Sequence, residues 1–301
     1  MPRRILSASS QRRVDRRSRK NVVATFSIAG YDQATGEFGV AVQSKFLAVG
    51  AVVPWARAGV GAVATQAYAN PAYGPEGLAL LGSGKTAEEA VGALTRADGD
   101  REHRQLGIVD ARGRSATRTG EKCFDWAGGI AGTHYAAQGN ILVGREPVGA
   151  MAETFEQTGE LRLANRLLDA LAAAQEMGGD SRGQQSAALL IVREGGGYGG
   201  HNDRAIDLRV DEHPEPIQEL RRLHELHGLY FGEVKPEDVV RLEGEIREGA
   251  ASALRRLGYL SEDRELHEAL RAFVRTENFE EREQKDGYVD LEVLRFLQSR
   301  G

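Results

Sequence analysis

Small or polar residues alternate with apolar residues over much of the first half of the chain. Residues 25–29 (TFSIA) and 37–46 (EFGVAVQSKF) follow the period-two pattern of half-buried strands. The polar, glycine-containing residues between them predict a turn, so the two segments are expected to form a hairpin. Residues 49–55 and 60–66 predict two more strands, and residues 104–119 predict a second hairpin.

Helix-forming segments interrupt these strands. Thr86 and Glu89 have the spacing of a capping box, in which each side chain bonds the other residue's backbone N–H, so a helix is expected over residues 87–97. Helices are also expected from near Pro147 to about residue 156 and over residues 160–177. The other elements expected in this part of the chain are a buried strand at 186–192, a strand at 205–211 and a helix from Pro216 to about residue 226.

The order of these elements indicates the fold class. Several hairpins favour antiparallel sheets, and separate helix pairs favour two outer helical layers. A dinucleotide-binding fold is disfavoured, because no G-x-G-x-x-G follows a strand and opens a helix. The expected class is therefore α+β, built from antiparallel sheets and covering helices.

Charge and glycine content divide the chain into three segments. Residues 1–20 hold eight Arg or Lys and one Asp, and we expect residues 1–24 to form a basic, disordered leader. The main domain is expected over residues 25–232. Residues 233–301 are poor in glycine and carry 12 basic and 17 acidic residues, which predicts a small helical domain. The starts expected for its three helices are Pro236, Ser261 and the residue after Asp290.

Composition excludes several classes of protein. The 301-residue chain is 41% hydrophobic and 28% charged, so it can bury a sizeable core. One cysteine, Cys123, excludes a disulfide scaffold, and a catalytic thiol is not expected because no helper residue is identifiable. No apolar run approaches the ~20 residues of a membrane-spanning helix, and no export signal is recognisable. The protein is expected in the cytoplasm, with neither nucleic acid nor a membrane as a partner.

Thr25 is the strongest candidate for a catalytic residue. A hydroxyl nucleophile needs a base, and a threonine at a chain terminus can use its own α-amine, whose ordinary pKa is about 7.7–8.0. This chemistry requires removal of the 24 preceding residues. Ser27 lies two residues further along the same strand face and is a candidate for lining the same site. The alternative is that Thr25 only begins a strand.

Two loops are candidates for substrate binding. Gln66, Asn70 and Tyr73 are polar residues in a loop that follows a strand, where substrate contacts are common. Asn70 and Tyr73 precede Pro71 and Gly74, so turn formation explains them equally well. The second loop, DSRGQQS, immediately precedes the buried strand at 186–192.

The residues of the second loop have chemistry suited to a small polar ligand. Arg182 and Gln185 can hold a carboxylate or an amide, and Ser186 completes the segment. The alternative is a strand-entry loop in which Asp180 and Arg182 pair with each other.

A weaker candidate is a metal site at residues 207–213. Alternation places Asp207, Arg209 and Asp211 on one strand face, and His213 follows. Carboxylates and an imidazole would suit a hard or borderline divalent ion. A network of ion pairs is the alternative, and we expect no cofactor.

Long segments of the chain resemble the DUF1028 family. The resemblance lies in residues 25–74 and in four shorter segments: RQLGIVD (104–110), QGNIL (138–142), GGDSRGQQSAALLIV (178–192) and DLRVDEHPEPIQELRRL (207–223). That family resembles the N-terminal-nucleophile (Ntn) hydrolases, which implies a four-layer αββα sandwich. It also implies that Thr25 attacks an amide carbonyl and forms an acyl-enzyme, with a small amide or peptide-like compound as substrate. The sequence departs from the family pattern at Arg118, where histidine is common, and at Glu212.

The C-terminal segment is similar to a second family, one described as peptidoglycan-binding. The similar segments are ALRRLGY, EALRAF, TENFEER and DLEVLRFL. The similarity makes peptidoglycan a candidate partner. A docking or oligomerisation module is the alternative, and we expect the protein to form homo-oligomers.

Three hypotheses for function follow. The leading one is an Ntn-type amidohydrolase that uses Thr25. The second is a non-catalytic binding protein that docks peptidoglycan or a protein partner through its C-terminal domain. The third is a metal-dependent hydrolase that uses Asp207, Asp211 and His213.

Overall fold

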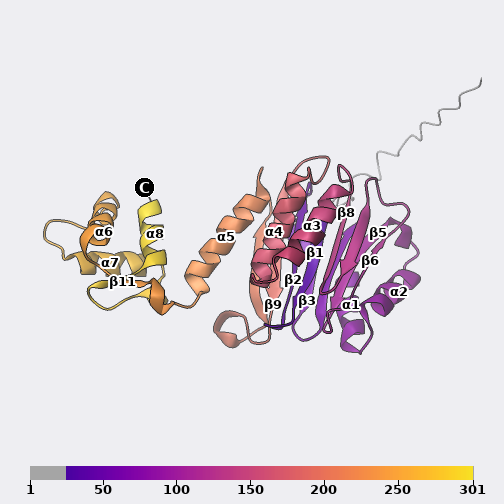
Figure 1. Ribbon diagram of the computed structural model, residues 1–301, viewed down its shortest axis with the longest axis horizontal. Coiled ribbons are helices and arrows are strands. Elements are labelled where there is room, and N and C mark those ends of the chain that lie inside the picture. Colours follow the sequence, from indigo (N-terminus) through magenta and orange to yellow (C-terminus); the bar gives the residue numbers. More distant parts are fainter. Residues whose placement is uncertain (1–24, 301) are drawn as a thin grey trace, which may run out of the picture. The chain divides into compact units, whose positions relative to one another are not determined.

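The computed structural model describes residues 25–300 of the chain (Figure 1). The leader expected at residues 1–24 lies outside the described residues. The chain divides into two compact units between Arg221 and Arg222, within the helix Pro216–Phe231 (α5). Each unit is described separately below.

The larger sheet of the first unit has six strands in the order β10-β9-β2-β1-β8-β7, and every neighbouring pair is antiparallel. Its strands are β1 (Thr25–Asp32), β2 (Glu37–Ser44), β7 (Gly128–Gly132), β8 (Tyr135–Asn140), β9 (Ser186–Val192) and β10 (Arg204–Val210). Because β1 lies between β2 and β8, Thr25 begins an interior strand. Its register partners are Ser44 on β2 and Asn140 on β8.

The smaller sheet has four antiparallel strands in the order β3-β4-β5-β6. Its strands are β3 (Pro54–Arg57), β4 (Gly61–Ala67), β5 (Arg104–Asp110) and β6 (Ser115–Thr119). Contacts of β1 with β4, of β2 with β3 and of β5 with β8 stack the two sheets face to face. The face of β1 that carries Thr25 and Ser27 is directed at the smaller sheet, because the Ser27 side chain bonds Gln66 of β4.

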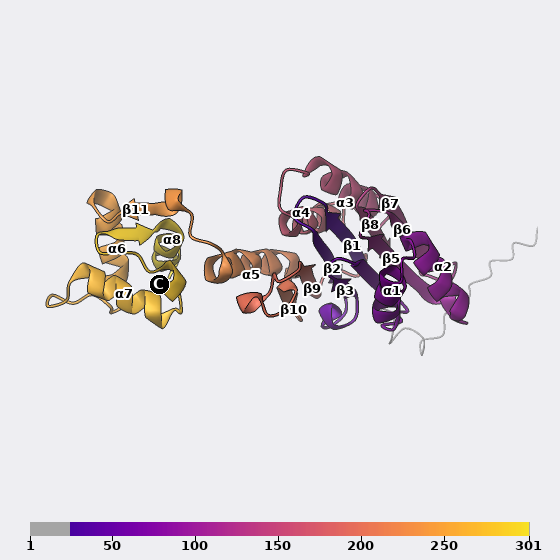
Figure 2. The same ribbon diagram turned by 90° about the horizontal axis from the view of Figure 1, so that it is seen from below.

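Helices cover both outer faces of this pair of sheets. The helices are α1 (Tyr73–Gly82), α2 (Ala87–Ala97), α3 (Glu146–Gln157) and α4 (Leu163–Glu176). Helices α1 and α2 pack on the smaller sheet, and α3 and α4 pack on β1, β2 and β8 of the larger one (Figures 1 and 2). The unit is the four-layer αββα sandwich of two antiparallel sheets that was expected.

Local sequence signals explain several of these elements. Helix α2 begins with the capping box: the Glu89 N–H donates to Thr86 Oγ1 at 3.1 Å, and the Thr86 N–H donates to Glu89 Oε2 at 2.7 Å. Strand β9 is buried along its whole length, as its continuous apolar sequence predicts. Helix α4 buries a stripe of four leucines at helical spacing, namely Leu163, Leu167, Leu168 and Leu171.

Other parts of the unit differ from the sequence prediction. The prediction of a strand over residues 49–55 is wrong, because Val49–Ala51 is a 3₁₀ turn and the strand in this region is Pro54–Arg57. The loop predicted to hold Gln66, Asn70 and Tyr73 is shorter than expected, since Gln66 lies in β4 and helix α1 begins at Tyr73. Strands β7 and β8 were not predicted. Their sequences, GGIAG and YAAQGN, are rich in glycine and alanine, which have low strand propensity. The pairing of β8 with β1, and of β7 with β8, therefore decides their conformation.

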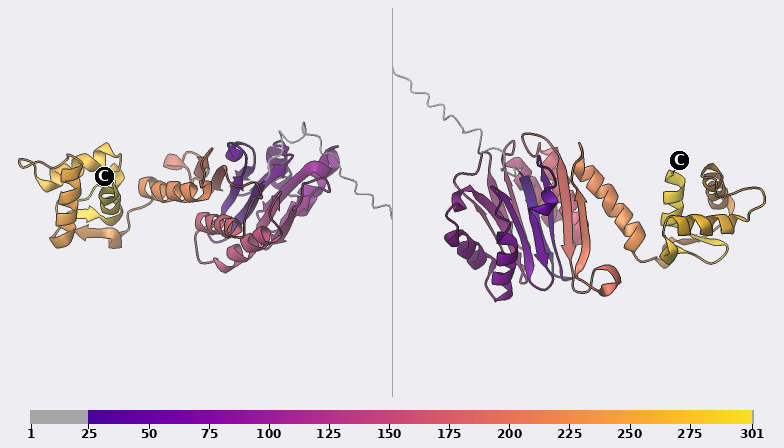
Figure 3. Two further views of the ribbon diagram at one scale, coloured as in Figure 1. Left: turned by 90° about the horizontal axis from the view of Figure 1, so that it is seen from above. Right: turned by 180° about the vertical axis from the view of Figure 1, so that it is seen from behind.

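The second unit begins within α5 and also contains three further helices and a short sheet. These further elements are the gold and yellow segments in both panels of Figure 3. The helices are α6 (Gly244–Arg256), α7 (Leu266–Thr276) and α8 (Leu291–Ser299), and β11 (Val239–Arg241) pairs with β12 (Tyr288–Asp290). They enclose a core that includes Leu254, Phe273 and Leu297.

Two helix starts expected in the second unit are wrong. The helix expected from Pro236 begins only at Gly244, because the β-branched residues Val239 and Val240 pair with β12 instead. The second helix begins at Leu266 and its N-cap is Glu265, so Ser261 does not cap it. The third start is confirmed: the Asp290 carboxylate accepts the first N–H groups of α8.

Candidate functional site

Thr25 lies where the interior of the larger sheet meets the smaller one. Its side chain is fully buried, and Oγ1 donates a hydrogen bond to Ser44 Oγ at 3.1 Å. Ser44 ends β2 and Asn140 ends β8, so both strands that pair with β1 place a polar side chain beside Thr25. A hydroxyl is therefore held inside the fold by a second hydroxyl.

Buried amide side chains connect Thr25 to the smaller sheet. Ser27 Oγ donates to Gln66 Oε1 at 2.5 Å. Gln66 Nε2 in turn donates to the Thr25 carbonyl at 3.3 Å and to Gln105 Oε1 at 2.8 Å. Two of the predicted residues, Ser27 and Gln66, thus form one network with Thr25.

Side chains of strand β8 extend the same hydrogen-bond network back to the larger sheet. Gln138 Nε2 donates to Ser27 Oγ at 2.7 Å, and Asn140 Nδ2 donates to Gln105 Oε1 at 3.0 Å. Gln105 Nε2 donates to the Gly139 carbonyl at 2.7 Å. We call these six residues the amide layer: Thr25, Ser27, Gln66, Gln105, Gln138 and Asn140. All six are fully buried.

Sequence reasoning missed three members of the amide layer. Gln105, Gln138 and Asn140 come from strands that show no unusual motif individually. The available signal was a polar amide in an otherwise apolar or small-residue segment. For Gln138 and Asn140 that segment, QGNIL, also carried part of the family resemblance.

Two observations distinguish the Thr25 end of the amide layer from an ordinary polar core. Oδ1 of Asn140 is buried and has no hydrogen-bond partner within residues 25–300, although buried polar atoms are normally bonded. In addition, Ile141 has φ 55° and Ala67 has φ 64°. A β-branched residue in this region is strained, and such strain concentrates at functional sites. Each of the two follows a member of the amide layer, Asn140 or Gln66.

Gly107 on β5 makes room for the amide layer. A Cβ built at this glycine would overlap the side-chain amide of Gln138. We expect Gly107→Ala to lower the free energy of unfolding by about 1–3 kcal/mol, because the fully buried Gln138 has no space into which it can withdraw. Urea unfolding followed by tryptophan fluorescence measures this, since Trp55 and Trp126 both lie in the first unit.

Gly149→Ala is the matched control for this prediction. Gly149 lies within helix α3, and a Cβ there meets nothing within 4 Å. Alanine is favoured over glycine in a helix, so this variant is expected to be slightly more stable than the parent. Equal stability of the Gly107→Ala variant and the parent would contradict close packing over Gln138.

Asn70 and Tyr73 belong to a different cluster, centred on Asp98. Tyr73 Oη donates to Asp98 Oδ2 at 2.8 Å, and Asn70 Nδ2 approaches the same oxygen at 3.5 Å. Arg104 Nε donates to it at 2.9 Å. Burial raises the pKa of Asp98, but the hydrogen bonds from Arg104, the Asp100 N–H and Tyr73 outweigh burial and lower the pKa from 3.8 to about 2. Burial and the Asp98 carboxylate raise the pKa of Tyr73.

The Asp98 cluster predicts a loss of stability in acid. A pKa below its unfolded value means that ionised Asp98 stabilises the fold above about pH 4, and that this stabilisation is lost as the pH falls towards 2. Asp98→Asn is therefore expected to be less stable than the parent at neutral pH and to lose less stability between pH 4 and 2. Urea unfolding at several pH values measures the difference. The exposed Asp263→Asn is the control, and a parallel pH profile for parent and Asp98→Asn would refute the assignment.

The loop at 180–186 reaches the Thr25 site indirectly, through β2. Arg182 Nη2 donates to Asp180 Oδ2 at 3.0 Å, which is the local pairing that we considered as the alternative. The Gln185 N–H donates to the Ser44 carbonyl at 3.1 Å. Ser186 Oγ bonds the Phe46 carbonyl and accepts the Val49 N–H.

The Gln185–Ser44 backbone bond links this loop to Thr25, because Ser44 also accepts the Thr25 hydroxyl. The loop therefore holds the end of β2 in place. The structure brings Thr25, Ser27 and Gln66 into one network, whereas Arg182, Gln185 and Ser186 support that network from outside.

The residues considered for a metal site do not gather into one. Within residues 25–300, no three His, Cys, Asp or Glu side chains are placed to hold a metal ion. The Asp207 carboxylate pairs with Arg204 and Arg209, and His213 Nδ1 accepts the Glu215 N–H. The Asp211 side chain is exposed.

The remaining candidates for chemistry in the first unit are occupied by structural contacts. Burial raises the pKa of the Cys123 thiol to about 11, so it is protonated at neutral pH. Arg118, where the sequence departs from the family pattern, pairs with Glu102 at 2.8 Å. Thr119, which follows it, accepts a hydrogen bond from Gln105 Nε2 at 2.8 Å and so contacts the amide layer.

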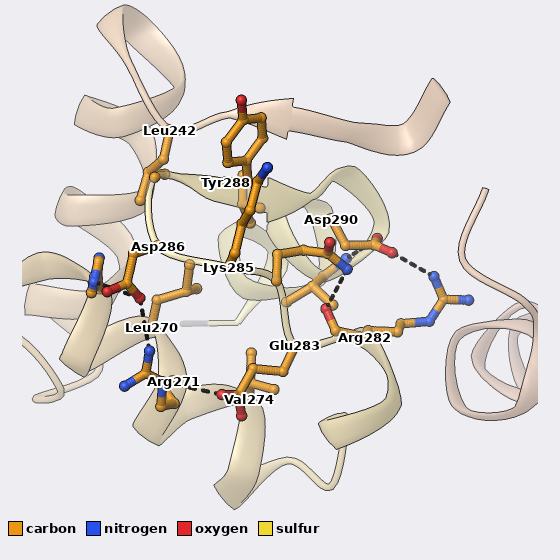
Figure 4. Close-up of a pocket in the computed structure, with 15 residues that line it drawn as sticks. Leu242, Leu270, Arg271, Val274, Arg282, Glu283, Lys285, Asp286, Tyr288 and Asp290 are labelled. Atoms are coloured by element: carbon orange, nitrogen blue, oxygen red, sulfur yellow. Dashed lines mark hydrogen bonds and ion pairs between the residues drawn. The ribbon is translucent and has the colours of Figure 1, made fainter. Parts of the chain in front are cut away.

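The second unit has a shallow pocket of about 20 Å³ (Figure 4). Its charged side chains are paired: Arg271 contacts Glu283 and Asp286, and the Lys285 ammonium lies 4.5 Å from the Tyr288 ring centroid. The surface therefore combines charge with an aromatic ring.

The first unit is thus an αββα sandwich with a threonine hydroxyl at the start of an interior strand and amides buried between its two sheets. The chain belongs to the DUF1028 family: the model described as "Family of unknown function (DUF1028)" matches residues 25–220. A similar solved structure is that of protein SPO2555 from Silicibacter pomeroyi, which carries the same family model. The two chains are 34% identical with a TM-score of 0.63, and the match covers 69% of this chain and 88% of that one. No curated protein matches this chain.

The second unit has a match of its own. The family model described as "Putative peptidoglycan binding domain" matches residues 230–297. Within residues 25–300, no helix is long and apolar enough to cross a membrane. The chain thus joins a DUF1028 domain to a second domain that matches this other family model.

Proposed function

We propose that the protein is an Ntn-type amidohydrolase that cleaves the C–N bond of a small amide or peptide-like compound. The observation that carries the proposal is the position of Thr25. Its hydroxyl lies at the start of an interior strand of an αββα sandwich, inside a buried polar layer. A hydroxyl in this place needs only the adjacent α-amine to become a nucleophile with its own base.

The reaction begins once cleavage of the Ala24–Thr25 peptide bond has freed the amine. Thr25 Oγ1 attacks the substrate carbonyl carbon, and the α-amine takes the hydroxyl proton. The C–N bond then breaks, the leaving amine receives that proton, and the acyl group remains on Thr25 as an ester. Water gives a proton to the α-amine and attacks the ester, which releases the carboxylic acid and returns the proton to Oγ1.

The surrounding residues have supporting roles in this proposal. Ser44 orients the Thr25 hydroxyl through their 3.1 Å hydrogen bond. Asn140 directs its Nδ2 group to Gln105, which leaves Oδ1 as an open acceptor on the strand next to Thr25. We assign Asn140 as a positioning residue that accepts a hydrogen bond from the freed α-amine. Backbone N–H groups or a side-chain amide stabilise the oxyanion.

The terminal-amine mechanism is tested on the purified full-length chain. Intact mass and N-terminal sequencing are expected to show that Thr25 is the first residue. Hydrolysis of a panel of N-acyl amides is expected only from the processed form. Amide hydrolysis by protein that retains residues 1–24 would overturn the mechanism.

A second candidate function is retention on peptidoglycan through the second unit. The family match over residues 230–297 supports it. The test is sedimentation of the full-length chain with purified peptidoglycan. Unprocessed protein that sediments, shows no amide hydrolysis and is unaffected by Thr25→Ala would favour a binding protein over an enzyme.

Location and assembly complete the proposal. We propose that the protein is a cytoplasmic homo-oligomer. Retention on peptidoglycan, the second candidate function, requires instead that the protein lies outside the cell membrane. Cell fractionation separates these alternatives. Light scattering on the purified chain tests oligomer formation, and a monomer mass would contradict it.

A further inference from the structure

A pocket of about 300 Å³ lies in the first unit. Tyr68, Asp100, His103 and Phe124 line it. This volume is at the lower end of the roughly 300–1,000 Å³ found for small-molecule sites. Neither the proposed mechanism nor the family matches give it a role.

The first wall of the pocket follows directly from the amide layer. Tyr68 comes two residues after Gln66, and His103 comes two residues before Gln105. Tyr68 directly follows β4, and His103 ends the 3₁₀ turn Arg101–His103 directly before β5. The Tyr68 N–H donates to the His103 carbonyl at 3.1 Å, so both residues lie just beyond the strand ends that carry Gln66 and Gln105.

Phe124, another lining residue, is connected to the other strand beside Thr25. The Phe124 carbonyl accepts the Ile141 N–H at 3.1 Å. Ile141 is the strained residue that follows Asn140, the register partner of Thr25. Both parts of the lining therefore continue from residues that flank the proposed nucleophile.

The lining of the pocket indicates the kind of group that it accepts. The rings of Tyr68 and His103 are 6.1 Å apart at an angle of 59°, and Phe124 adds a third ring. Aromatic walls at such angles favour a flat aromatic guest, which packs on them edge to face or offset. The Asp100 carboxylate at the rim is 74% exposed and pairs with Arg104 at 3.6 Å, so the selectivity of the pocket rests on its rings and not on charge.

We propose that this pocket selects the substrate: it holds an aromatic group next to the amide that Thr25 attacks. The inference rests on the proposed function, because the scissile amide must lie at Thr25. It adds the substrate class, namely amides that carry an aromatic ring on one side of the C–N bond.

Binding is measured separately from turnover, on the full-length chain. The probes are phenylacetamide, benzylamine, benzoate and isobutyramide, and NMR titration gives their affinities. Phenylacetamide, benzylamine and benzoate, which carry a ring, are expected to bind at least tenfold more tightly than the aliphatic isobutyramide. Tyr68→Ala and Phe124→Ala are expected to weaken ring binding at least tenfold. Tyr198→Ala is the control, since that side chain is 82% exposed.

The outcomes separate this inference from the proposed function. Ring binding that is lost in Phe124→Ala, without hydrolysis of any amide, supports the pocket and contradicts the amidohydrolase. Hydrolysis with the same kcat/KM for aromatic and aliphatic amides contradicts substrate selection by the pocket but agrees with the proposed amidohydrolase activity. Phe124→Leu keeps an apolar side chain, so it tests the role of the ring even if Phe124→Ala does not fold. Unchanged affinity for the ring probes in both Phe124 variants would overturn the inference.

Discussion

Thr25→Ala is expected to lower kcat/KM for amide hydrolysis by a factor on the order of 10⁴ or more, the scale of loss seen when a catalytic nucleophile is removed. Alanine lacks the oxygen that would form the ester, while the strand pairing of β1 on both sides does not depend on the side chain. If Thr25 also drives cleavage of the preceding peptide bond, the variant will retain residues 1–24. Activity assays and intact mass measure the two effects together.

Two variants serve as controls for the Thr25 experiment. Thr25→Ser keeps a hydroxyl in the same place and is expected to retain measurable hydrolysis and processing. Thr35→Ala removes a hydroxyl from an exposed turn and is expected to behave like the parent. Undiminished hydrolysis by a well-folded Thr25→Ala variant would exclude Thr25 as the nucleophile.

Arg282→Leu is expected to destabilise the second unit by about 3–5 kcal/mol, the usual cost of removing one partner of a buried ion pair. Arg282 is only 5% exposed and its Nη1 lies 2.9 Å from Asp290 Oδ2 (Figure 4). Its guanidinium also donates to the carbonyls of Gly228 and Leu229, at the C-terminal end of α5. Leucine leaves the Asp290 carboxylate buried without its cation and these carbonyls without their donor.

Hydrogen exchange measured by mass spectrometry localises this effect. Faster exchange is expected in α7 and α8, whereas the strands of the first unit should keep their protection. Arg275→Ala is the matched control, because Arg275 pairs with Glu283 at an exposed site and such pairs contribute about 0–1 kcal/mol. Unchanged exchange in α7 and α8 of Arg282→Leu would contradict a stabilising role for the buried pair.

The sequence predicted best those elements whose stability is local or whose pattern is continuous. The capping box at Thr86 and Glu89 specified the start of α2, and the apolar run of β9 specified a fully buried strand. Secondary-structure prediction was poor for segments whose conformation depends on pairing with a strand that is distant in sequence. Strand β8 forms because β1 pairs with it, and Val239 extends because β12 lies beside it. The domain boundary near residues 231–232 stays a prediction.

The candidate site shows the same division. Thr25 and its strand were recognisable from the chain, because alternation identifies a strand and places Thr25 and Ser27 on one face. Asn70 and Tyr73 were grouped with Gln66 only because they are close to it in sequence, and the structure bonds both to Asp98 instead. Sequence neighbours at a strand end can turn to different sides, so spacing alone does not assign them to one site.

The sequence by itself determined the α+β class, the family resemblance and the strand that begins at Thr25, because short-range periodicity and ordered motifs are properties of the chain. Only the tertiary structure decided the amide layer and the pocket beside it. Gln66, Gln105 and Asn140 are separated by 35 residues or more along the chain and meet only when the two sheets stack. Such contacts depend on the register and packing of distant strands, which no local pattern encodes.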